Sequence, residues 1–343
     1  MRILFIRFSS LGDILLTFPF VSAIRKKYPK SKIFFVTKSE YADLFSLNKD
    51  IDNLLLFDKK NDSLWKLSET IRNEKFDYIF DLHNNLRSNL VLLFNASKSD
   101  KLKKYSFRKF FLVKTKINYL KNLPLIRERY SNTSKKFNLI NNFELKEFVN
   151  NYTISINKMY TNNVKDKLPF LRNYEKIVGL CPSARHKTKI LPENKLINIG
   201  KQLLDNNKVA ILIFGDKNES EYCERLKNNL SINHVYNIAG KNSIIETAAT
   251  LSLCNVVITN DTGLMHLANL LNIPLIAIFG STVKDLGFYP TGKNSFVVEN
   301  ADLKCRPCSH IGLSSCPKKH FKCMNDINEK LIVEKTIPFL FNV

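Results

Sequence analysis

The chain has 343 residues, of which 44% are hydrophobic and 24% are charged, and its formal net charge is +22 at pH 7. This composition excludes a disordered chain and favours a globular protein with two domains. The excess of positive charge favours an anionic partner, such as nucleic acid, an anionic lipid surface or a phosphorylated substrate.

The termini and the cysteines bear on the compartment. The apolar stretch within Met1–Arg7 is too short for a signal sequence and is expected to form the first strand. No apolar run reaches the ~18–20 residues that a membrane span needs. The seven cysteines are an odd number, which fits a reducing compartment better than a disulfide framework. We therefore expect a cytoplasmic protein.

The N-terminal half alternates strand-like and helix-like segments. The expected strands are 2–8, 32–36, 52–57 and 76–81, and the expected helices are 14–27, 65–73 and a short one that runs through residue 93. Pro19 either lies in the first turn of the 14–27 helix or kinks it. The alternation predicts a parallel α/β sheet.

Residues 98–129, here called the basic segment, differ in composition from their surroundings. Aromatic residues are interleaved with many cations, and the only carboxylates are Asp100 and Glu128. The cations are Lys98, Lys101, Lys103, Lys104, Arg108, Lys109, Lys114, Lys116, Lys121, Arg127 and Arg129. Two interpretations stay open. The segment lies on an anionic membrane surface or an acidic substrate, or it is a solvated helix and loop with lysine-rich outer faces.

A second α/β series follows a polar stretch at 161–174, which we assign to an inter-domain linker. Its strands are expected at 176–180, 209–214, 256–258 and 275–279. Its helices are expected at 192–205, 219–230 and 243–253, and a last helix at 327–341. Two such halves predict a cleft between them, which is a common location for a ligand.

The turn within Asn260–Ala268 joins a buried strand to a helix. Asp261, Thr262 and Gly263 lie where open α/β sheets bind ligands and where the N–H groups of a helix N-terminus face an anion. The alternative is that Asp261 or Thr262 only caps the helix and that His266 is a packed helix residue.

Similar small, polar turns follow other strands, at 9–13, 183–189 and 280–282. Together they would supply N–H groups, hydroxyls and a lysine, which suit a diphosphate held without a metal. Asp13 is the candidate general base for an acceptor hydroxyl, or it caps a helix together with Gly12. Lys189 is either a fixed cation of the site or a solvent-exposed lysine. The chain has no G-x-G-x-x-G after its first strand, no P-loop and no G-x-S-x-G elbow.

Four cysteines lie near the C-terminus, at Cys305, Cys308, Cys316 and Cys323. They could bind a structural zinc ion, but buried or surface thiols are favoured because the spacing beyond C-x-x-C is loose.

Three motifs carry a resemblance to a known family. They are S-S-L-G-D at Ser9–Asp13 with Pro19 downstream, T-K-x-x-P at Thr188–Pro192, and D-T-G-L-M-H-L-A at Asp261–Ala268. Lesser segments agree at 81–88, 237–241 and 279–282. Over nearly its whole length, the chain resembles the bacterial heptosyltransferases of glycosyltransferase family nine.

The resemblance implies a GT-B fold, an α/β fold with two Rossmann-like domains facing across a cleft. An acceptor-side domain is expected at 1–165 and a donor-binding domain at 175–325, with 326–343 as a helix that packs back toward the first domain. The implied reaction is an inverting, metal-independent transfer of heptose from ADP-heptose to the inner core of lipopolysaccharide, on a lipid A-Kdo or heptose acceptor. The expected place is the cytoplasmic face of the inner membrane, with no cofactor other than the nucleotide-sugar donor and no nucleic acid partner.

The same resemblance assigns roles by motif. Asp13 is the base, and Lys189 is the cation near the diphosphate and sugar. The implied donor-binding residues are Thr188, Glu219, Asp261, Thr262, Gly263 and His266. The implied acceptor-binding residues are Ser10, Gly12 and Arg87.

The chain departs from the family pattern in places. Ser183 stands where the family often has glycine, Ile190 stands where an aromatic residue is common, and the basic segment matches no family motif residue by residue. Two alternatives stay open. One is a family-nine enzyme with another nucleotide sugar or glycan acceptor, and the other is a basic nucleic-acid-binding protein, supported by the charge alone.

Overall fold

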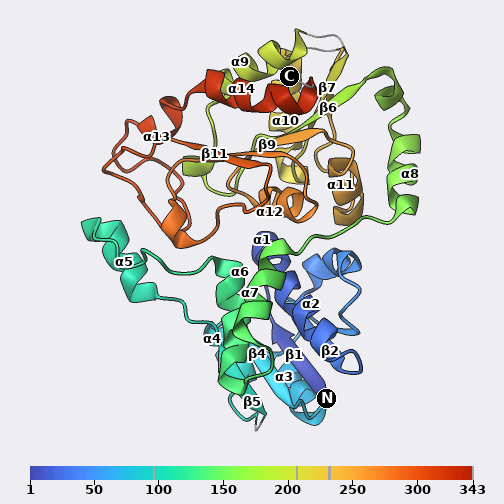
Figure 1. Ribbon diagram of the computed structural model, residues 1–343, viewed down its shortest axis with the longest axis vertical. Coiled ribbons are helices and arrows are strands. Elements are labelled where there is room, and N and C mark those ends of the chain that lie inside the picture. The colour runs from blue at the N-terminus through green and yellow to red at the C-terminus, as the bar shows by residue number, and fades with distance from the viewer. Residues whose placement is uncertain (96, 206–207, 231–232, 342–343) are drawn as a thin grey trace. The chain divides into compact units, whose positions relative to one another are not determined.

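The computed structural model describes residues 1–95, 97–205, 208–230 and 233–341 (Figure 1). They form two compact units. Unit 1 comprises Met1–Tyr105 and Pro124–Ile154, and unit 2 comprises Ser106–Leu123 and Ser155–Val343. Each unit is built on one sheet whose strands all pair in parallel, which confirms the predicted α/β class. The last two residues of the predicted terminal segment 326–343 lie outside the described residues.

Unit 1 has the strand order β3-β2-β1-β4-β5. Its strands are β1 (Arg2–Ile6), β2 (Lys32–Lys38), β3 (Asn53–Phe57), β4 (Tyr78–Asp81) and β5 (Lys98–Lys101). Its α-helices are α1 (Leu11–Leu15), α2 (Phe18–Lys27), α3 (Leu64–Asn73), α4 (Leu86–Val91), α6 (Ile126–Ser131) and α7 (Asn142–Asn151). β1 is the central strand, so its carboxyl end opens at the middle of the sheet edge, where ligands of such folds bind.

The helix expected at 14–27 is two helices. α1 ends at Leu15, and Pro19 lies in the first turn of α2. Proline is favourable there because its missing N–H would have had no partner in the helix. The break leaves α1 as a separate single turn that carries Asp13 directly after β1.

Aromatic packing fixes β1 against its neighbours. The ring of Phe5 lies 5.2 Å from that of Phe20 on α2 and 5.3 Å from that of Phe80 on β4, centroid to centroid. All three side chains are fully buried. Aromatic pairs at such distances add roughly 0.5–1.5 kcal/mol each beyond their buried area. Packing against α2 and β4 therefore fixes β1, the strand that leads into α1.

Unit 2 has the strand order β11-β10-β9-β6-β7-β8. Its strands are β6 (Lys176–Cys181), β7 (Val209–Ile213), β8 (Val235–Asn237), β9 (Val256–Asn260), β10 (Leu275–Phe279) and β11 (Ser295–Glu299). Its α-helices are α5 (Ser106–Thr115), α8 (Lys158–Lys167), α9 (Glu193–Leu204), α10 (Ser220–Leu230), α11 (Ile244–Leu251), α12 (Gly263–Leu270), α13 (Lys322–Asn325) and α14 (Glu329–Leu340). Every residue of β7, β9 and β10 is buried, as expected of strands covered on both faces.

Helix α14 packs beside α9 and against β9, β10 and β11 of the same unit (Figure 1). Lys195 Nζ on α9 pairs with Glu329 of α14 at 2.7 Å. None of the helices in the described part of the chain is long and apolar enough to cross a membrane.

Residues 161–174, assigned to the linker from sequence, hold α8 from its fourth residue onward and the 3-10 helix Pro169–Asn173. α8 packs on α11 of unit 2. Val164 is its one buried residue, which explains why no apolar periodicity is visible in the sequence.

The basic segment is divided between the units. Its β5 end belongs to unit 1, Ser106–Leu123 with α5 belongs to unit 2, and α6 belongs to unit 1 again. Lys116 Nζ donates to the carbonyl of Pro307 at 2.7 Å, which ties the α5 excursion to the C-terminal part of unit 2.

Candidate functional site

In unit 1, the first turn of α1 places Ser10, Gly12 and Asp13 at the carboxyl end of β1. The Asp13 carboxylate closes this turn, because its Oδ2 accepts from the Ser10 hydroxyl at 2.8 Å and from the Ser10 N–H at 3.3 Å. Gly12 is buried, whereas the Asp13 side chain keeps 22% of its surface exposed. Asp13 therefore combines the helix-capping interpretation with a carboxylate that a ligand can reach.

Two partners of Asp13 escaped the sequence analysis. Arg7, the residue that follows β1, places its Nη2 2.7 Å from Asp13 Oδ1. The hydroxyl of Tyr130 on α6 donates to the same oxygen at 3.2 Å. An arginine that ends an otherwise buried strand is a signal that could have pointed to Arg7. Nothing local points to Tyr130, which is 117 residues away from Asp13 in the sequence.

The end of β4 lies against this cluster. Asp81 is fully buried and accepts from the N–H groups of His83 and Asn84 and from the Ser88 hydroxyl. These bonds shape the loop that leads into α4, which carries Arg87. Arg87 lies close enough to His83 for its charge to lower the pKa of that imidazole. The structure therefore brings Arg87 into the same region as Asp13.

His83 is neutral in this setting. Its Nδ1 accepts from the N–H of Phe8 at 3.2 Å, so Nε2 carries the proton. Burial, followed by the charges of Arg7 and Lys104, lowers the pKa of His83 to about 3. Burial, followed by the charge of Arg7, also lowers the pKa of Lys104. A histidine held neutral in this way is a poor proton acceptor at neutral pH.

In unit 2, Asp261 lies between β9 and α12 and is held from two other loops. Its Oδ2 is 2.7 Å from Lys189 Nζ and accepts from the Thr282 hydroxyl at 2.8 Å. The Lys189 side chain is 15% exposed, and the Asp261 side chain is 8% exposed. Three of the polar turns predicted from sequence thus converge at one sheet edge.

The loop that carries Thr188 and Lys189 is held firmly. Thr188 N–H donates to the carbonyl of Leu313 at 3.1 Å, and the Leu313 N–H donates to the Thr188 hydroxyl at 2.8 Å. The Thr188 hydroxyl also lies 3.0 Å from that of Ser281. Thr188 therefore links the loop to the C-terminal segment by hydrogen bonds. The backbone that carries the neighbouring Lys189 is fixed by these bonds.

The N-terminus of α12 begins with Thr262 as the residue before the first helical position, Gly263. Thr262 Oγ1 is buried and has no hydrogen-bond partner. Such a group is costly to bury without a partner, and it lies beside the N–H groups that a helix start leaves unpaired. His266 is also buried, one turn further on, with its ring 6.2 Å from that of Phe288. This terminus suits an anionic ligand.

Glu219 occupies the turn after β7, where it completes a capping box with Asp216. Its Oε2 accepts from the Asp216 N–H at 2.8 Å, and Asp216 Oδ1 accepts from the Glu219 N–H at 3.1 Å. A Cβ on Gly215 would lie 3.1 Å from Glu219 Oε2, so the glycine gives the carboxylate its room. Glu219 thus lies at the carboxyl edge of the same sheet as Asp261.

Arg306 is a further residue that the sequence analysis missed. It is buried and donates to the carbonyls of Gly280, Thr282 and Asn300, and it pairs with Glu299. These bonds fix the turn that carries Thr282, and hence the partner of Asp261. The signal was weak, because arginine in a cysteine-rich loop is usually taken as solvent-exposed.

The four C-terminal cysteines are free thiols. Burial raises the pKa of Cys323 to about 11 and also raises that of Cys308. Among the residues that the structure describes, no three His, Cys, Asp or Glu side chains are arranged to hold a metal ion.

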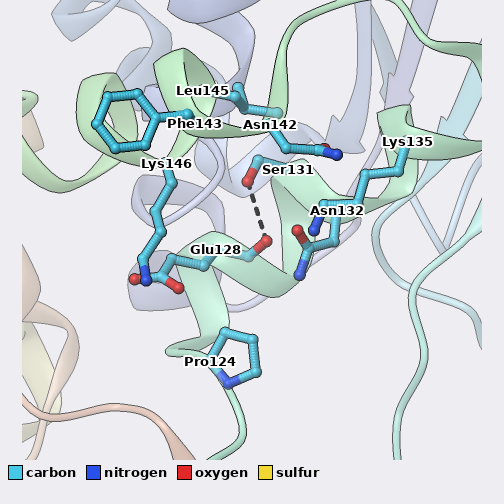
Figure 2. A pocket seen from close by; sticks show the side chains of 9 residues that line it. All are labelled: Pro124, Glu128, Ser131, Asn132, Lys135, Asn142, Phe143, Leu145 and Lys146. Carbon is cyan, nitrogen blue, oxygen red and sulfur yellow. Dashed lines mark hydrogen bonds between the residues drawn. The ribbon is translucent and has the colours of Figure 1, made fainter.

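A separate hollow of about 320 Å³ lies in unit 1 between α6, α7 and the turn that follows α6 (Figure 2). Glu128 and Ser131 line it from α6, and Phe143 and Lys146 line it from α7. None of the predicted site residues lines it.

The family model described as glycosyltransferase family 9 (heptosyltransferase) matches residues 64–319. The chain belongs to glycosyltransferase family 9. It is therefore an enzyme that transfers a sugar, and the resemblance seen in its motifs is confirmed.

Relatives of the family 9 enzyme cover nearly its full length. The lipooligosaccharide heptosyltransferase 2 of Campylobacter jejuni is 24% identical over 338 residues, which are 97% of this chain and 96% of the relative. The structure of the ADP-heptose lipopolysaccharide heptosyltransferase II of Escherichia coli superposes with a TM-score of 0.77 at 19% identity, covering 100% of this chain and 99% of that one. A family 9 glycosyltransferase from Veillonella parvula gives 0.78 at 19% identity, covering 100% and 98%. These likenesses establish the GT-B fold.

The neutral state of His83 predicts acid sensitivity. Its folded-state pKa of about 3 lies below the ordinary value of 6.5, so below pH 6.5 the unfolded chain binds a proton that the folded chain does not. The free energy of unfolding should therefore fall by up to about 1.4 kcal/mol per pH unit between pH 6.5 and 3 from this group. His83→Asn keeps an acceptor for the Phe8 N–H and should remove that part of the slope in urea unfolding at pH 6.5, 5.5 and 4.5. The matched change at exposed His320 should leave the slope unchanged, and an unaltered slope in the His83 variant would contradict the assignment.

Proposed function

We propose that this enzyme transfers a heptose from ADP-heptose, with inversion, to the inner core of a lipopolysaccharide precursor. The family assignment supports the reaction class, and the names of the relatives support the donor and the acceptor. The observation that carries the proposal is the Lys189–Asp261 pair beside the buried, unpartnered hydroxyl of Thr262 at the start of α12.

Unit 2 is proposed to hold the donor. The start of α12 offers N–H groups, the Thr262 hydroxyl and the positive end of a helix dipole to the diphosphate. Lys189 neutralises the charge that develops on the leaving diphosphate, so no metal is needed for this step. Asp261, His266 and Thr188 frame the sugar end, and Glu219 accepts hydrogen bonds from the ribose hydroxyls. In binding ribose, Glu219 exchanges its local bond to the Asp216 N–H for one to the ligand.

Unit 1 is proposed to hold the acceptor, with Asp13 as the general base. An inverting transfer needs one base and stabilisation of the leaving group, and no second carboxylate nucleophile. Ser10 and Gly12 shape the turn that receives the acceptor hydroxyl. Arg87, on the loop built around Asp81, contacts an anionic group of the acceptor.

The enzyme is proposed to work on the cytoplasmic face of the inner membrane and to reach its lipid-linked acceptor through the α5 excursion. There the side chains of Phe107 and Phe110 are 74% and 56% exposed, and Tyr119 is 55% exposed. Phe111 contacts all three rings, at centroid distances of 4.7–6.1 Å. Exposed apolar rings and a tyrosine interleaved with Lys and Arg are suited to the interface of an anionic bilayer.

A family 9 enzyme with a different nucleotide sugar is the second candidate, because Ser183 and Ile190 depart from the family pattern in the donor loop. A panel of nucleotide sugars with mass spectrometry of the product separates the two. Transfer from ADP-heptose that is at least ~10-fold more efficient than from other donors supports the first. The family assignment gives no support to a nucleic-acid-binding role.

Lys189→Ala should lower kcat/KM for the donor by roughly 10²–10³-fold, because it removes a charged donor at the leaving group. Lys187 is the matched control, since it is exposed two residues away in the same loop, and Lys187→Ala should change kcat/KM less than ~3-fold. Steady-state kinetics with varied donor gives both values. Thermal unfolding of each variant separates loss of function from loss of fold. An unchanged kcat/KM for Lys189→Ala removes Lys189 from the site.

Asp13→Asn should lower kcat by about 10²–10⁴-fold while donor affinity changes little, because the amide cannot take the proton of the acceptor hydroxyl. Asp43→Asn is the control, since this aspartate is exposed in the same unit. Turnover is measured with saturating donor, and donor affinity by calorimetry. Near-normal turnover of the Asp13 variant would end the base assignment.

Vesicle binding tests the membrane proposal. Co-sedimentation with vesicles containing phosphatidylglycerol should exceed that with neutral vesicles and should weaken in 0.5 M salt, because charge screening shortens the range of the attraction. Phe107→Ser with Phe110→Ser should reduce binding by ~10-fold or more. Trp65→Ser, which changes an exposed aromatic residue of unit 1, serves as the control. Equal binding to neutral vesicles, or binding that salt does not affect, counts against docking by this segment.

A further inference from the structure

The two oxygens of the Asp13 carboxylate lie in different surroundings. Oδ1 faces inward, where Arg7 Nη2 lies at 2.7 Å and the Tyr130 hydroxyl at 3.2 Å. Oδ2 faces Ser10, an exposed residue, whose hydroxyl lies at 2.8 Å and whose N–H lies at 3.3 Å. Of these three partners, Ser10 is the exposed one.

We propose that Arg7 and Tyr130 are positioning residues that hold Asp13 through Oδ1 and leave Oδ2 as the atom that takes the proton from the acceptor. This inference rests on the proposed role of Asp13 as the base. It adds that Arg7 and Tyr130 orient the carboxylate and that Oδ2 is the oxygen that takes the proton.

Arg7 is fixed on the protein side. Its Nε donates to the carbonyl of Ser9 at 2.8 Å, and its Nη1 donates to the carbonyl of Leu82 at 2.7 Å. All three of its nitrogens are therefore engaged, and its orientation is set by the backbone at the ends of β1 and β4. Burial alone would lower the pKa of Arg7, but Tyr130 and Asp13 raise it above its usual value. The guanidinium therefore stays charged, and its bonds to the two backbone carbonyls keep it in place.

Tyr130 closes the other side of Oδ1. Its side chain is fully buried, and the Arg7 guanidinium lies 5.6 Å from its ring centre. Burial raises the pKa of the Tyr130 hydroxyl far above the working range, so it remains a donor. Oδ1 thus accepts from two fixed donors, Arg7 and Tyr130, and has no lone pair left for the substrate proton.

The Ser10 hydroxyl marks the place of the substrate hydroxyl. It is the exposed partner of Oδ2, and an acceptor O–H at a similar distance would replace its bond. In the transfer, the acceptor O–H bond breaks, and its proton goes to Oδ2. The acceptor oxygen forms a bond to the anomeric carbon as the bond from that carbon to the diphosphate oxygen breaks. The electron pair leaves with the diphosphate, and Oδ2 later releases the proton to water.

Further charged groups lie around Asp13. His83 and Lys104 lie close enough to interact with its charge, and both feel Arg7. Asp81 is engaged by its own loop, and Arg87 acts on His83. Neutral His83 carries no charge, and the Arg7 guanidinium is in direct contact with the carboxylate.

Tyr130→Phe tests the inference, because it removes one hydroxyl and keeps the ring. The carboxylate loses a donor to its charged form, so the acid limb of kcat/KM for the acceptor should move to higher pH by roughly 0.5–1 unit. At pH 8, kcat should fall by ~3–10-fold, and donor affinity should stay unchanged. Tyr28→Phe is the matched control, since Tyr28 is another unit 1 tyrosine whose hydroxyl donates to a backbone carbonyl, that of Leu139.

Arg7→Lys gives a second measurement, because it keeps the charge and loses the fork that fixes it. We expect kcat to fall by ~10²-fold with the fold retained in circular dichroism. If Arg7→Lys fails to fold, the Tyr130→Phe profile alone decides. A lowered activity with the wild-type pH profile in Tyr130→Phe means a merely structural role and overturns the inference. An active Asp13→Asn enzyme overturns the proposed base itself, so the two failures are distinguishable.

Discussion

A partly buried carboxylate has to be compensated, and this requirement shapes both halves of the enzyme in the same way. Each unit places an aspartate where a central strand gives way to a helix: Asp13 after β1 and Asp261 after β9. Each pairs with one cation at 2.7 Å and accepts from one hydroxyl of a distant element. Because leaving such a charge unpaired costs several kcal/mol, the cation and the hydroxyl are as much a part of the fold as of the site.

The two cations differ in a way that suits different tasks. Arg7 is tied to two backbone carbonyls and presents a rigid fork, so it keeps its carboxylate in one orientation. Lys189 has a flexible stem and a single ammonium group, so it can turn from Asp261 toward a phosphate oxygen without moving the loop. In the proposed mechanism, the rigid arginine orients the carboxylate that takes the proton, and the flexible lysine follows the charge that develops on the leaving diphosphate.

Sequence reasoning reached those parts of the structure that local chemistry determines. The strands with continuous apolar runs were predicted, and so were the turns that carry Asp13, Lys189 and Asp261. The strands β5, β8 and β11 were not predicted. β5 is entirely polar, β8 has only three residues, and β11 has only three apolar residues between polar ends. Tyr130 and Arg306 act through partners that only the fold brings close. The split between α1 and α2 was visible in Pro19 but undecided, since proline fits a first turn as well as a kink.

The division of the basic segment has a mechanical consequence. The chain passes from one unit to the other at three points, after Tyr105, after Leu123 and after Ile154. The two units are therefore joined by three covalent connections and not by a single linker. The second of these crossings leads through Pro124 and Leu125 directly into α6, and Arg129 of α6 donates back to the Pro124 carbonyl at 2.6 Å. The α5 excursion is thus joined, within a few residues, to α6, the helix that carries Tyr130, the proposed positioning residue of Asp13.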